Sequence, residues 1–252
     1  IPIAHVESGL RSFDQSMPEE INRIVTDNLA DHFFVTEQSG IDNLLEEGKK
    51  AADIYFVGNT MIDALVAYDQ VIAENTIMTK LDVTERAFAL VTIHRPSNVD
   101  NKSALEQNIH LLQNIAIKYP VVFPVHPRTK NKLEQFQLLS LLTSNPNIRI
   151  CEPLDYFAFQ KLIASCKFIV TDSGGIQEEA TFRKKPCITI RPNTERPSTI
   201  TLGTNTLVEA DISKINQLIT DIEKHNYKEG NIPPLWDGKA TARIFQVLDK
   251  LR

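Results

Sequence analysis

The chain has 252 residues, of which 42% are hydrophobic and 23% are charged, as expected for a globular protein with one large or two smaller domains. A net charge of −5 argues against a nucleic-acid-binding protein, and no apolar run is long enough to predict a membrane span. Cys151, Cys166 and Cys187 have no metal-ligand spacing and lie in or beside apolar segments, so we expect buried free thiols. Together with the lack of a visible signal peptide, this favours a cytoplasmic protein.

The first third of the chain alternates between strand and helix patterns. Strands are expected at 1–6, 32–35 and 54–57, and helices at 18–30, 38–48 and 60–73. Pro18 and the acidic residues after it are typical of a helix start, and Gly48 is typical of a helix end. The polar segment 74–86 has little strand character and is interpreted as an interdomain linker.

A second series of strand and helix patterns fills the rest of the chain. Strands are expected at 88–93, 121–125, 148–151, 168–171 and 187–190, and helices at 103–118, 129–142, 156–165, 176–184, 212–223 and 239–250. Repeated βα units with apolar strands predict an α/β fold whose parallel sheets are covered on both faces. Ligands bind such sheets beyond the carboxyl ends of the strands, where several polar residues fall: His5, Glu7, His94, His126, Pro153 and Ser173.

The segment 172–179 carries the clearest functional pattern. An apolar strand ends at Asp172, and Ser173, Gly174 and Gly175 lead into a helix. The helix start offers unpaired N–H groups, and the glycines allow a phosphate to approach the backbone. Glu179, one helical turn later, is placed to accept hydrogen bonds from ribose hydroxyls. The alternative is a strand-to-helix corner in which the glycines serve only tight packing.

Two carboxylates near the start of the chain are candidates for acid–base chemistry. Glu7 lies just past the first strand, and Glu19 lies in the first turn of the next helix. Carboxylates in different environments can divide the roles of acid and base. The alternative is that Glu19 only complements the helix dipole and Glu7 is a surface residue.

Three further strand ends carry cationic or titratable side chains. His94 with Arg95 suits an anionic ligand, and His126, between two prolines, could face the same site. Arg191 or Arg196 could neutralise a diphosphate, although a solvated ion-pair loop explains them too. No zinc spacing, Walker loop or Ser-His-Asp order is present, so we expect no metal site.

These blocks, in this order, resemble the non-hydrolysing UDP-N-acetylglucosamine 2-epimerases. The resemblance covers essentially the whole chain and is carried by eight segments: 5–11, 18–23, 58–60, 92–95, 124–127, 173–179, 194–197 and 237–240. It implies two Rossmann-like domains that face each other across a cleft, as in GT-B glycosyltransferases. The expected boundaries are 1–85 for the later part of the first domain plus linker, 86–235 for the UDP-binding domain, and 236–252 for a last helix that returns to the first.

The resemblance also implies an activity and residue roles. The family interconverts UDP-N-acetylglucosamine and UDP-N-acetylmannosamine by eliminating UDP and adding it back, without a cofactor. Glu7 and Glu19 match its catalytic carboxylates, and His94 matches its catalytic-site histidine near the phosphates. Ser173, Gly174 and Gly175 match the diphosphate cradle and Glu179 the ribose contact, while Arg95 and His126 match positions linked to an allosteric substrate site in some members.

The chain departs from the family pattern at its start, where the first βα units are absent. We therefore expect an N-terminally truncated form with little or no epimerase activity alone, and a homodimer only when full length. The substrate could instead be another UDP-amino sugar, such as a UDP-diacetamido-uronic acid. A GT-B glycosyltransferase and a non-catalytic UDP-sugar binder are the other open interpretations.

Overall fold

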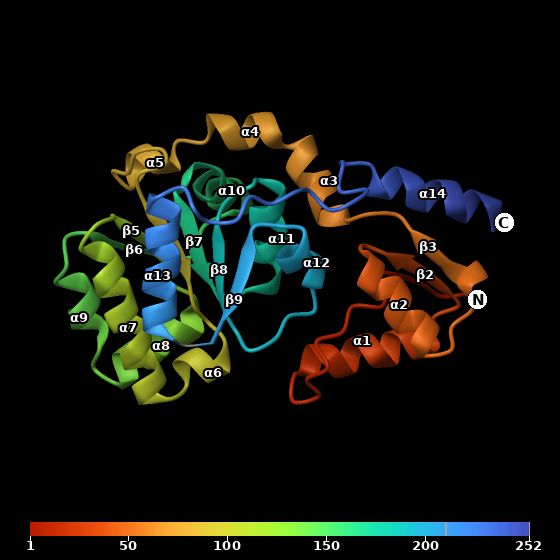
Figure 1. Ribbon diagram of the computed structural model, residues 1–252, viewed down its shortest axis with the longest axis horizontal. Helices are drawn as coiled ribbons and strands as arrows, with labels where there is room; N and C mark the ends of the chain where they lie inside the picture. The colour runs from red at the N-terminus through yellow and green to blue at the C-terminus, as the bar shows by residue number, and fades with distance from the viewer. Residues whose placement is uncertain (210, 252) are drawn as a thin grey trace. The chain divides into compact units, whose positions relative to one another are not determined.

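The computed structural model describes residues 1–209 and 211–251, which form two compact units (Figure 1). Unit 1 contains Ile1–Asp69, Asn193–Gly203 and the chain from Asn231 onward, and unit 2 contains Gln70–Pro192 and Thr204–Gly230. Both are α/β structures built on parallel sheets, as expected from the alternating pattern. No helix in the described part of the chain is long and apolar enough to cross a membrane.

Unit 1 is built on a three-stranded parallel sheet in the order β1-β2-β3. Its strands are β1 (Ala4–Val6), β2 (His32–Val35) and β3 (Ile54–Phe56), with Ala4 opposite His32 and Phe33 opposite Ile54. Its helices are α1 (Pro18–Leu29), α2 (Gln38–Glu46), the 3₁₀ turn η1 (Ala51–Asp53), α3 (Thr60–Ala67), α12 (Pro197–Thr201) and α14 (Ala240–Lys250).

Strand β2 divides the core of unit 1 because successive side chains point to opposite faces of a sheet. Phe33 and Val35 pack with Leu44 of α2 on one face. Phe34 packs on the other face with Val57 and with Ile244 of α14. The last helix is further fixed by Asp63 of α3, whose carboxylate accepts hydrogen bonds from the Ala240 and Thr241 main-chain N–H groups at 3.0 and 2.6 Å.

Unit 2 is built on a six-stranded parallel sheet in the order β6-β5-β4-β7-β8-β9. Its strands are β4 (Ala89–Thr92), β5 (Val121–Pro124), β6 (Ile148–Cys151), β7 (Phe168–Thr171), β8 (Cys187–Ile190) and β9 (Asn205–Val208). Its helices are α4 (Asp69–Glu74, whose first residue belongs to unit 1), α5 (Ile77–Lys80), α6 (Pro96–Val99), α7 (Lys102–Ala116), α8 (Pro127–Gln135), α9 (Leu139–Thr143), α10 (Tyr156–Ser165), α11 (Gly174–Phe182) and α13 (Ile212–Glu223).

Both faces of this sheet are covered by helices, which is why its strands appear in the sequence as continuous apolar runs. Phe168 and Val170 of β7 point into the core cluster that includes α7 and α13. Ile169 points into the opposite cluster, which includes α10 and α11. The carboxyl ends of β4 and β7 are joined by a 2.7 Å hydrogen bond between the hydroxyls of Thr92 and Thr171.

Several elements differ from the expectation. The helix expected at 60–73 ends at Ala67 and restarts as α4. The helix expected at 129–142 divides at Gln137, where φ is 59° and a right-handed helix cannot continue. Strand β9 was not predicted because its sequence begins with two polar residues at the sheet edge. Of the three cysteines, Cys166 and Cys187 are buried, but Cys151 is only partly buried.

The domain boundaries also differ from the expected ones. Residues 70–85 belong to unit 2 rather than to the first domain, because α5 lies against α10 and Ile77 enters its core. Residues 193–203 and 231–235 belong to unit 1 rather than to the UDP-binding domain. The first of these segments is held there by Arg196, which pairs with Glu7.

Candidate functional site

Glu7 sits at a sharp turn that follows β1. Its φ is 70°, in the left-handed region that residues with a Cβ rarely adopt. The turn is closed by the Phe34 carbonyl, which accepts hydrogen bonds from the Glu7 and Ser8 main-chain N–H groups at 3.0 and 3.1 Å. Non-glycine residues in this region often mark functional sites. The turn leaves the Glu7 side chain 38% exposed and therefore accessible, while its catalytic role stays a prediction.

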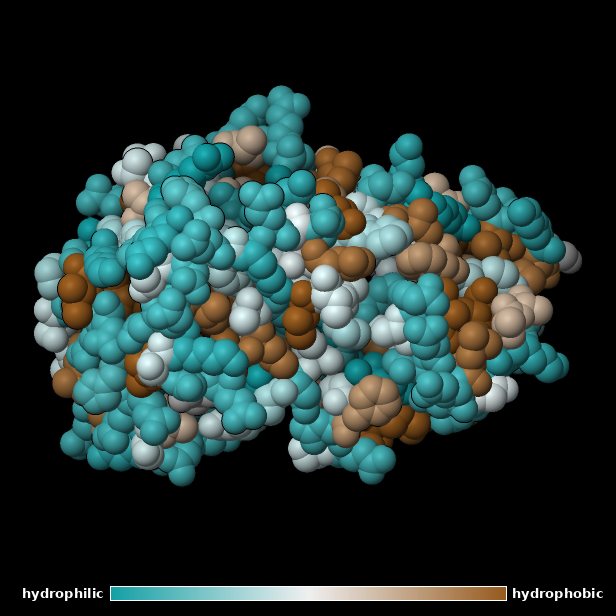
Figure 2. Space-filling view, in the orientation of Figure 1, coloured by the Kyte–Doolittle hydropathy of each residue, from teal (hydrophilic) through white to brown (hydrophobic). Residues whose placement is uncertain are grey.

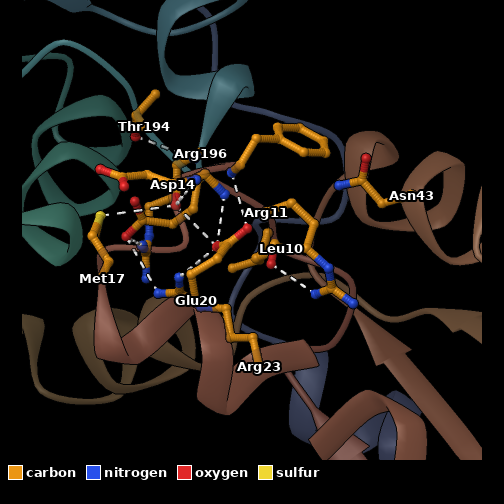
Figure 3. Close-up of polar contacts among 12 residues, drawn as sticks. Leu10, Arg11, Asp14, Met17, Glu20, Arg23, Asn43, Thr194 and Arg196 are labelled. Atoms are coloured by element: carbon orange, nitrogen blue, oxygen red, sulfur yellow. Dashed lines mark hydrogen bonds and ion pairs between the residues drawn. The ribbon is translucent and has the colours of Figure 1, made fainter. Parts of the chain in front are cut away.

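The Glu7 carboxylate is held by Arg196, whose Nη2 donates to Glu7 Oε1 at 3.1 Å. Arg196 also pairs with Glu195, and Arg23 of α1 lies 3.4 Å from the same Glu195 carboxylate. Figure 3 labels Arg23 and Arg196, the two arginines of this network in unit 1. Arg196 was predicted to contact phosphate; here its guanidinium contacts two carboxylates, and its role toward phosphate stays a prediction.

The two adjacent glutamates at the start of α1 have different environments. Glu20 is 1% exposed, and its carboxylate accepts hydrogen bonds from the Ser12 main-chain N–H, the Ser12 hydroxyl and the Phe13 main-chain N–H at 2.8 to 2.9 Å. It therefore fixes the loop that precedes the helix (Figure 3). Glu19 is exposed. Its side chain is therefore accessible, and its catalytic role stays a prediction.

Asp27 of α1 organises the rest of segment 5–11. It is fully buried, and its carboxylate contacts His5 Nδ1 at 2.6 Å, Arg11 Nη2 at 2.7 Å and the Gly9 main-chain N–H at 3.1 Å. Burial by itself raises the pKa of Asp27, but the hydrogen bonds from His5 and Arg11 outweigh it and hold this pKa below its usual value. Arg11 is further held by Glu47. His5 and Arg11 are therefore structural parts of the segment that carries Glu7.

In unit 2, the predicted phosphate cradle lies between β7 and α11. Ser173 is the N-cap residue of α11, and its main-chain N–H donates to Thr171 Oγ1 at 3.0 Å. A Cβ added to Gly175 would meet no described atom within 4 Å, and its φ is not positive. Neither packing nor backbone conformation therefore requires glycine there. The open space beside the helix N-terminus is where a phosphate would need room.

Asp172 joins this cradle to the neighbouring strand end and was missed as a site residue. It is fully buried. Its Oδ2 accepts hydrogen bonds from the His94 and Arg95 main-chain N–H groups and from Asn98 Nδ2 at 2.7 to 2.9 Å. Its Oδ1 lies 2.9 Å from His94 Nδ1. Its position directly before Ser173 at a strand end was the signal that could have identified it.

Asp172 fixes the orientation of His94. With Nδ1 directed at the carboxylate, the imidazole presents Nε2 as its free nitrogen. Burial of the Asp172 carboxylate by itself raises its pKa. The hydrogen bond from His94 and the charge of His94 outweigh this effect and hold the pKa of Asp172 below its usual value. The His94 side chain remains 34% exposed. It is therefore held in one orientation and stays accessible.

His126 lies beside His94, with 5.3 Å between their ring centroids. It is the N-cap of α8, and its Nδ1 accepts a hydrogen bond from the Arg128 main-chain N–H at 3.1 Å. Burial, followed by the charge of His94, lowers the pKa of His126. The neutral ring is therefore favoured at neutral pH.

Glu179 is only 6% exposed, and burial raises its pKa to about 7. A hydrogen bond with Gln160 opposes this effect in part. The predicted ribose contact is thus a carboxyl group near its titration point at neutral pH.

Within unit 2 the structure groups His94, His126, Arg95 and Asp172, and within unit 1 it groups Glu7 with Arg196. No cluster of three or more His, Cys, Asp or Glu suited to a metal occurs in residues 1–209 and 211–251.

Comparison with known proteins identifies the family of this chain. A family model described as UDP-N-acetylglucosamine 2-epimerase matches residues 1–249. The UDP-N-acetylglucosamine 2-epimerase of Methanocaldococcus jannaschii is 40% identical, over 98% of this chain and 69% of that protein. Its crystal structure in complex with UDP-GlcNAc and UDP matches with a TM-score of 0.89 at 40% identity, covering 99% of this chain and 69% of that one. The UDP-2,3-diacetamido-2,3-dideoxy-D-glucuronate 2-epimerase of Pseudomonas aeruginosa is 37% identical, over 100% of this chain and 69% of that protein.

Proposed function

The chain belongs to the UDP-N-acetylglucosamine 2-epimerase family, and we propose that it carries out, or supplies most of the residues for, the interconversion of UDP-N-acetylglucosamine and UDP-N-acetylmannosamine. One arrangement supports this above the others: a buried aspartate, Asp172, fixes His94 at a strand end next to the open space at Gly175. A rigid histidine beside a helix N-terminus suits a diphosphate leaving group.

The proposed reaction has two steps with UDP as the group that leaves and returns. A carboxylate removes the proton from C2 of the sugar while the bond between C1 and the diphosphate oxygen breaks, which gives a 2-acetamidoglucal and UDP. UDP then adds back at C1 while C2 receives a proton on the opposite face. We propose Glu7 and Glu19 as the groups that exchange these protons, because both side chains are accessible.

Departure of UDP places negative charge on the diphosphate, which requires donors aligned before the bond breaks. We propose that the Ser173 hydroxyl and the main-chain N–H groups at Gly174 and Gly175 receive the diphosphate at the start of α11, since the Ser173 main-chain N–H already donates to Thr171. We propose that His94 Nε2 donates a hydrogen bond to the diphosphate when it carries a proton, and that it can accept a proton when it carries none. Glu179 is proposed to accept hydrogen bonds from the ribose, which favours its ionised form because both oxygens then act only as acceptors.

Other features of the family are proposed for this chain on the same grounds. These are two Rossmann-like domains facing across a cleft, a homodimeric assembly and a cytoplasmic location. The chain matches 69% of the length of its M. jannaschii relative. We expect the chain by itself to bind UDP weakly and to turn over slowly or not at all.

The test has a binding arm and a catalytic arm. Calorimetry with UDP should show binding to this chain and a large loss in Gly175→Val, whose side chain fills the open space of the cradle. For catalysis, the part of the M. jannaschii enzyme that precedes the matched region would be joined to this chain and supplied with UDP-N-acetylglucosamine in D₂O. We expect deuterium to appear at C2 of both sugars. Transfer of the sugar to an acceptor would contradict the proposal, and so would a folded chimera that binds UDP but incorporates no deuterium at C2.

A second substrate is supported by the 37% identity to the UDP-diacetamido-glucuronate 2-epimerase of P. aeruginosa. Elimination at C2 is chemically the same for both sugars, so the proton-transfer residues do not separate them. Assaying the same chimera with both nucleotide sugars, and comparing kcat/KM, distinguishes the two assignments.

A further inference from the structure

A pocket of about 690 Å³ lies within unit 2 at the amino ends of its strands, the edge opposite to the cradle. Its lining includes Lys167 directly before β7, the segment 184–186 directly before β8, and Thr204 directly before β9. The chain that leaves α13 supplies another wall, with Tyr227 and residues around it. Figure 2 shows mainly hydrophilic surface over the end of α13 and the chain that follows it.

The lining of this pocket is strongly basic. Six lysine or arginine residues line it, against a single carboxylate, Glu229: Arg86, Lys167, Arg183, Lys184, Lys185 and Lys228. The whole chain has the opposite balance, with 27 basic and 32 acidic residues. A random sample of its surface would not give this excess, so the fold gathers positive charge at one concave place.

Two adjacent lysines of the lining, Lys184 and Lys185, have no carboxylate partner among residues 1–209 and 211–251. Lys185 Nζ donates to the Cys166 carbonyl at 3.2 Å. In the described residues, neither Lys184 nor Lys185 has a carboxylate within ion-pair distance. Burial lowers the pKa of Lys185, and the charges of Arg86 and Arg183 lower it further, although Cys166 and Glu85 act in the opposite direction. A bound anion would offset the repulsion that the charges of Arg86 and Arg183 exert on Lys185.

We propose that this pocket binds a compact anion with two or more phosphate groups, either free or as the phosphate tail of a nucleotide. Its volume suits a small molecule, and its basic residues gather at one concave place rather than along the extended track that a nucleic-acid strand needs. Several cations converging on one cavity match the charge of an oligophosphate better than that of a single carboxylate. This site is separate from the cradle at Ser173 and does not depend on the proposed epimerase reaction.

The experiment is calorimetry with sodium tripolyphosphate at fixed ionic strength. The variant Lys184→Gln/Lys185→Gln should bind at least tenfold more weakly, and a glutamine at 185 keeps a donor for the Cys166 carbonyl. The control is Lys102→Gln/Lys132→Gln, which removes the same charge from helices of the same unit outside the pocket. It should change the affinity less than twofold. Equal losses in both double variants would overturn the proposal, because they would indicate diffuse attraction only.

Two further arms separate the pocket from the cradle. Gly175→Val should retain tripolyphosphate binding. If Gly175→Val lost this binding while Lys184→Gln/Lys185→Gln kept it, the proposal would be overturned. Arg86→Gln, whose side chain is 80% exposed, tests the pocket without risk to folding and should also weaken binding. Repeating the titration of Gly175→Val with a nucleoside triphosphate identifies the source: tighter binding than tripolyphosphate supports a nucleotide tail, and equal binding supports the free anion.

Discussion

Two buried aspartates, one in each unit, contact a histidine through its Nδ1 atom but differ in what else surrounds them. Asp27 in unit 1 also binds the guanidinium of Arg11, so its charge is fully countered by a fixed cation. Asp172 in unit 2 has main-chain N–H groups, an amide and His94 as its partners. The exposed fraction of the histidine also differs, at 18% for His5 and 34% for His94.

This difference separates a structural carboxylate from one that orients a functional group. Asp27 holds the segment that presents Glu7, and its histidine faces inward. The contacts of Asp172 are two main-chain N–H groups, the Asn98 amide and the His94 imidazole, so this carboxylate orients a side chain that stays accessible. The same pair of residue types therefore stabilises a loop in unit 1 and positions an accessible imidazole in unit 2.

The largest expected effect is on stability, from Asp27→Ala. It leaves the Arg11 guanidinium, at 4% exposure, without its buried partner, which costs about 3–5 kcal/mol for a broken buried ion pair. Urea denaturation monitored by circular dichroism measures this loss. A change below about 1 kcal/mol would mean that Glu47 alone satisfies Arg11, and the structural role of Asp27 would be wrong.

The same aspartate predicts an acid sensitivity. Because its folded pKa lies below the usual value of 3.8, its contribution to stability is present above that value and is lost as pH falls through the folded pKa. The wild-type protein should therefore lose stability below about pH 4. Asp27→Asn should be less stable at pH 7 and should show a flatter decline below pH 4 in thermal unfolding.

Asp172→Asn tests positioning and should affect function more than stability. The asparagine oxygen can still accept the three hydrogen bonds now made to Oδ2, but its NH₂ group would face His94 Nδ1 and force the other tautomer. We expect a stability loss of about 1–3 kcal/mol and a larger loss of C2 deuterium exchange in the chimera. The pH profile of that exchange should shift, whereas a purely structural role would leave it unchanged.

The adjacent glutamates of α1 give a matched pair. Glu20→Gln removes an acceptor from a buried loop contact and should destabilise by about 1–3 kcal/mol. Glu19→Gln is exposed and should change stability by less than about 0.5 kcal/mol while abolishing exchange at C2. Retained exchange in Glu19→Gln would remove this residue from the proposed mechanism.

The smallest effect concerns Glu179, whose pKa is raised to about 7 against an ordinary value of 4.5. The folded state holds a proton that the unfolded state releases, so stability falls as pH rises from 4.5 to 7. If the carboxylate accepts ribose hydrogen bonds, UDP binding should release protons near pH 7 and tighten as pH rises. Calorimetry in buffers of different ionisation enthalpy measures this release, which should disappear in Glu179→Gln.

The sequence predicted elements best where burial decides them. Helices α10 and α13 and strands β7 and β8 have the expected bounds, because their apolar patterns reflect packing on the sheet. Strand β9 was missed because an edge strand that begins Asn205-Thr206 shows no apolar run. The helix breaks at 68 and 137 depend on local backbone geometry that periodicity does not show.

The candidate residues were predicted from their positions at strand ends, but their partners were not. Asp172 lies 78 positions from His94 in the chain, and Arg196 lies 189 positions from Glu7. Such contacts follow from tertiary structure, and no local pattern indicates them. The same limit explains why residues 193–203, expected in the UDP-binding domain, group with unit 1 in the structure.

The discontinuous make-up of unit 1 has a consequence for biosynthesis. The apolar face formed by Phe34 and Val57 is covered by Ile244 of α14, and all of unit 2 lies between Val57 and Ile244 in the chain. During translation this face leaves the ribosome long before the helix that covers it, so unit 2 is complete first. Until α14 emerges, the nascent sheet of unit 1 exposes a hydrophobic surface that a chaperone must shield or that risks aggregation.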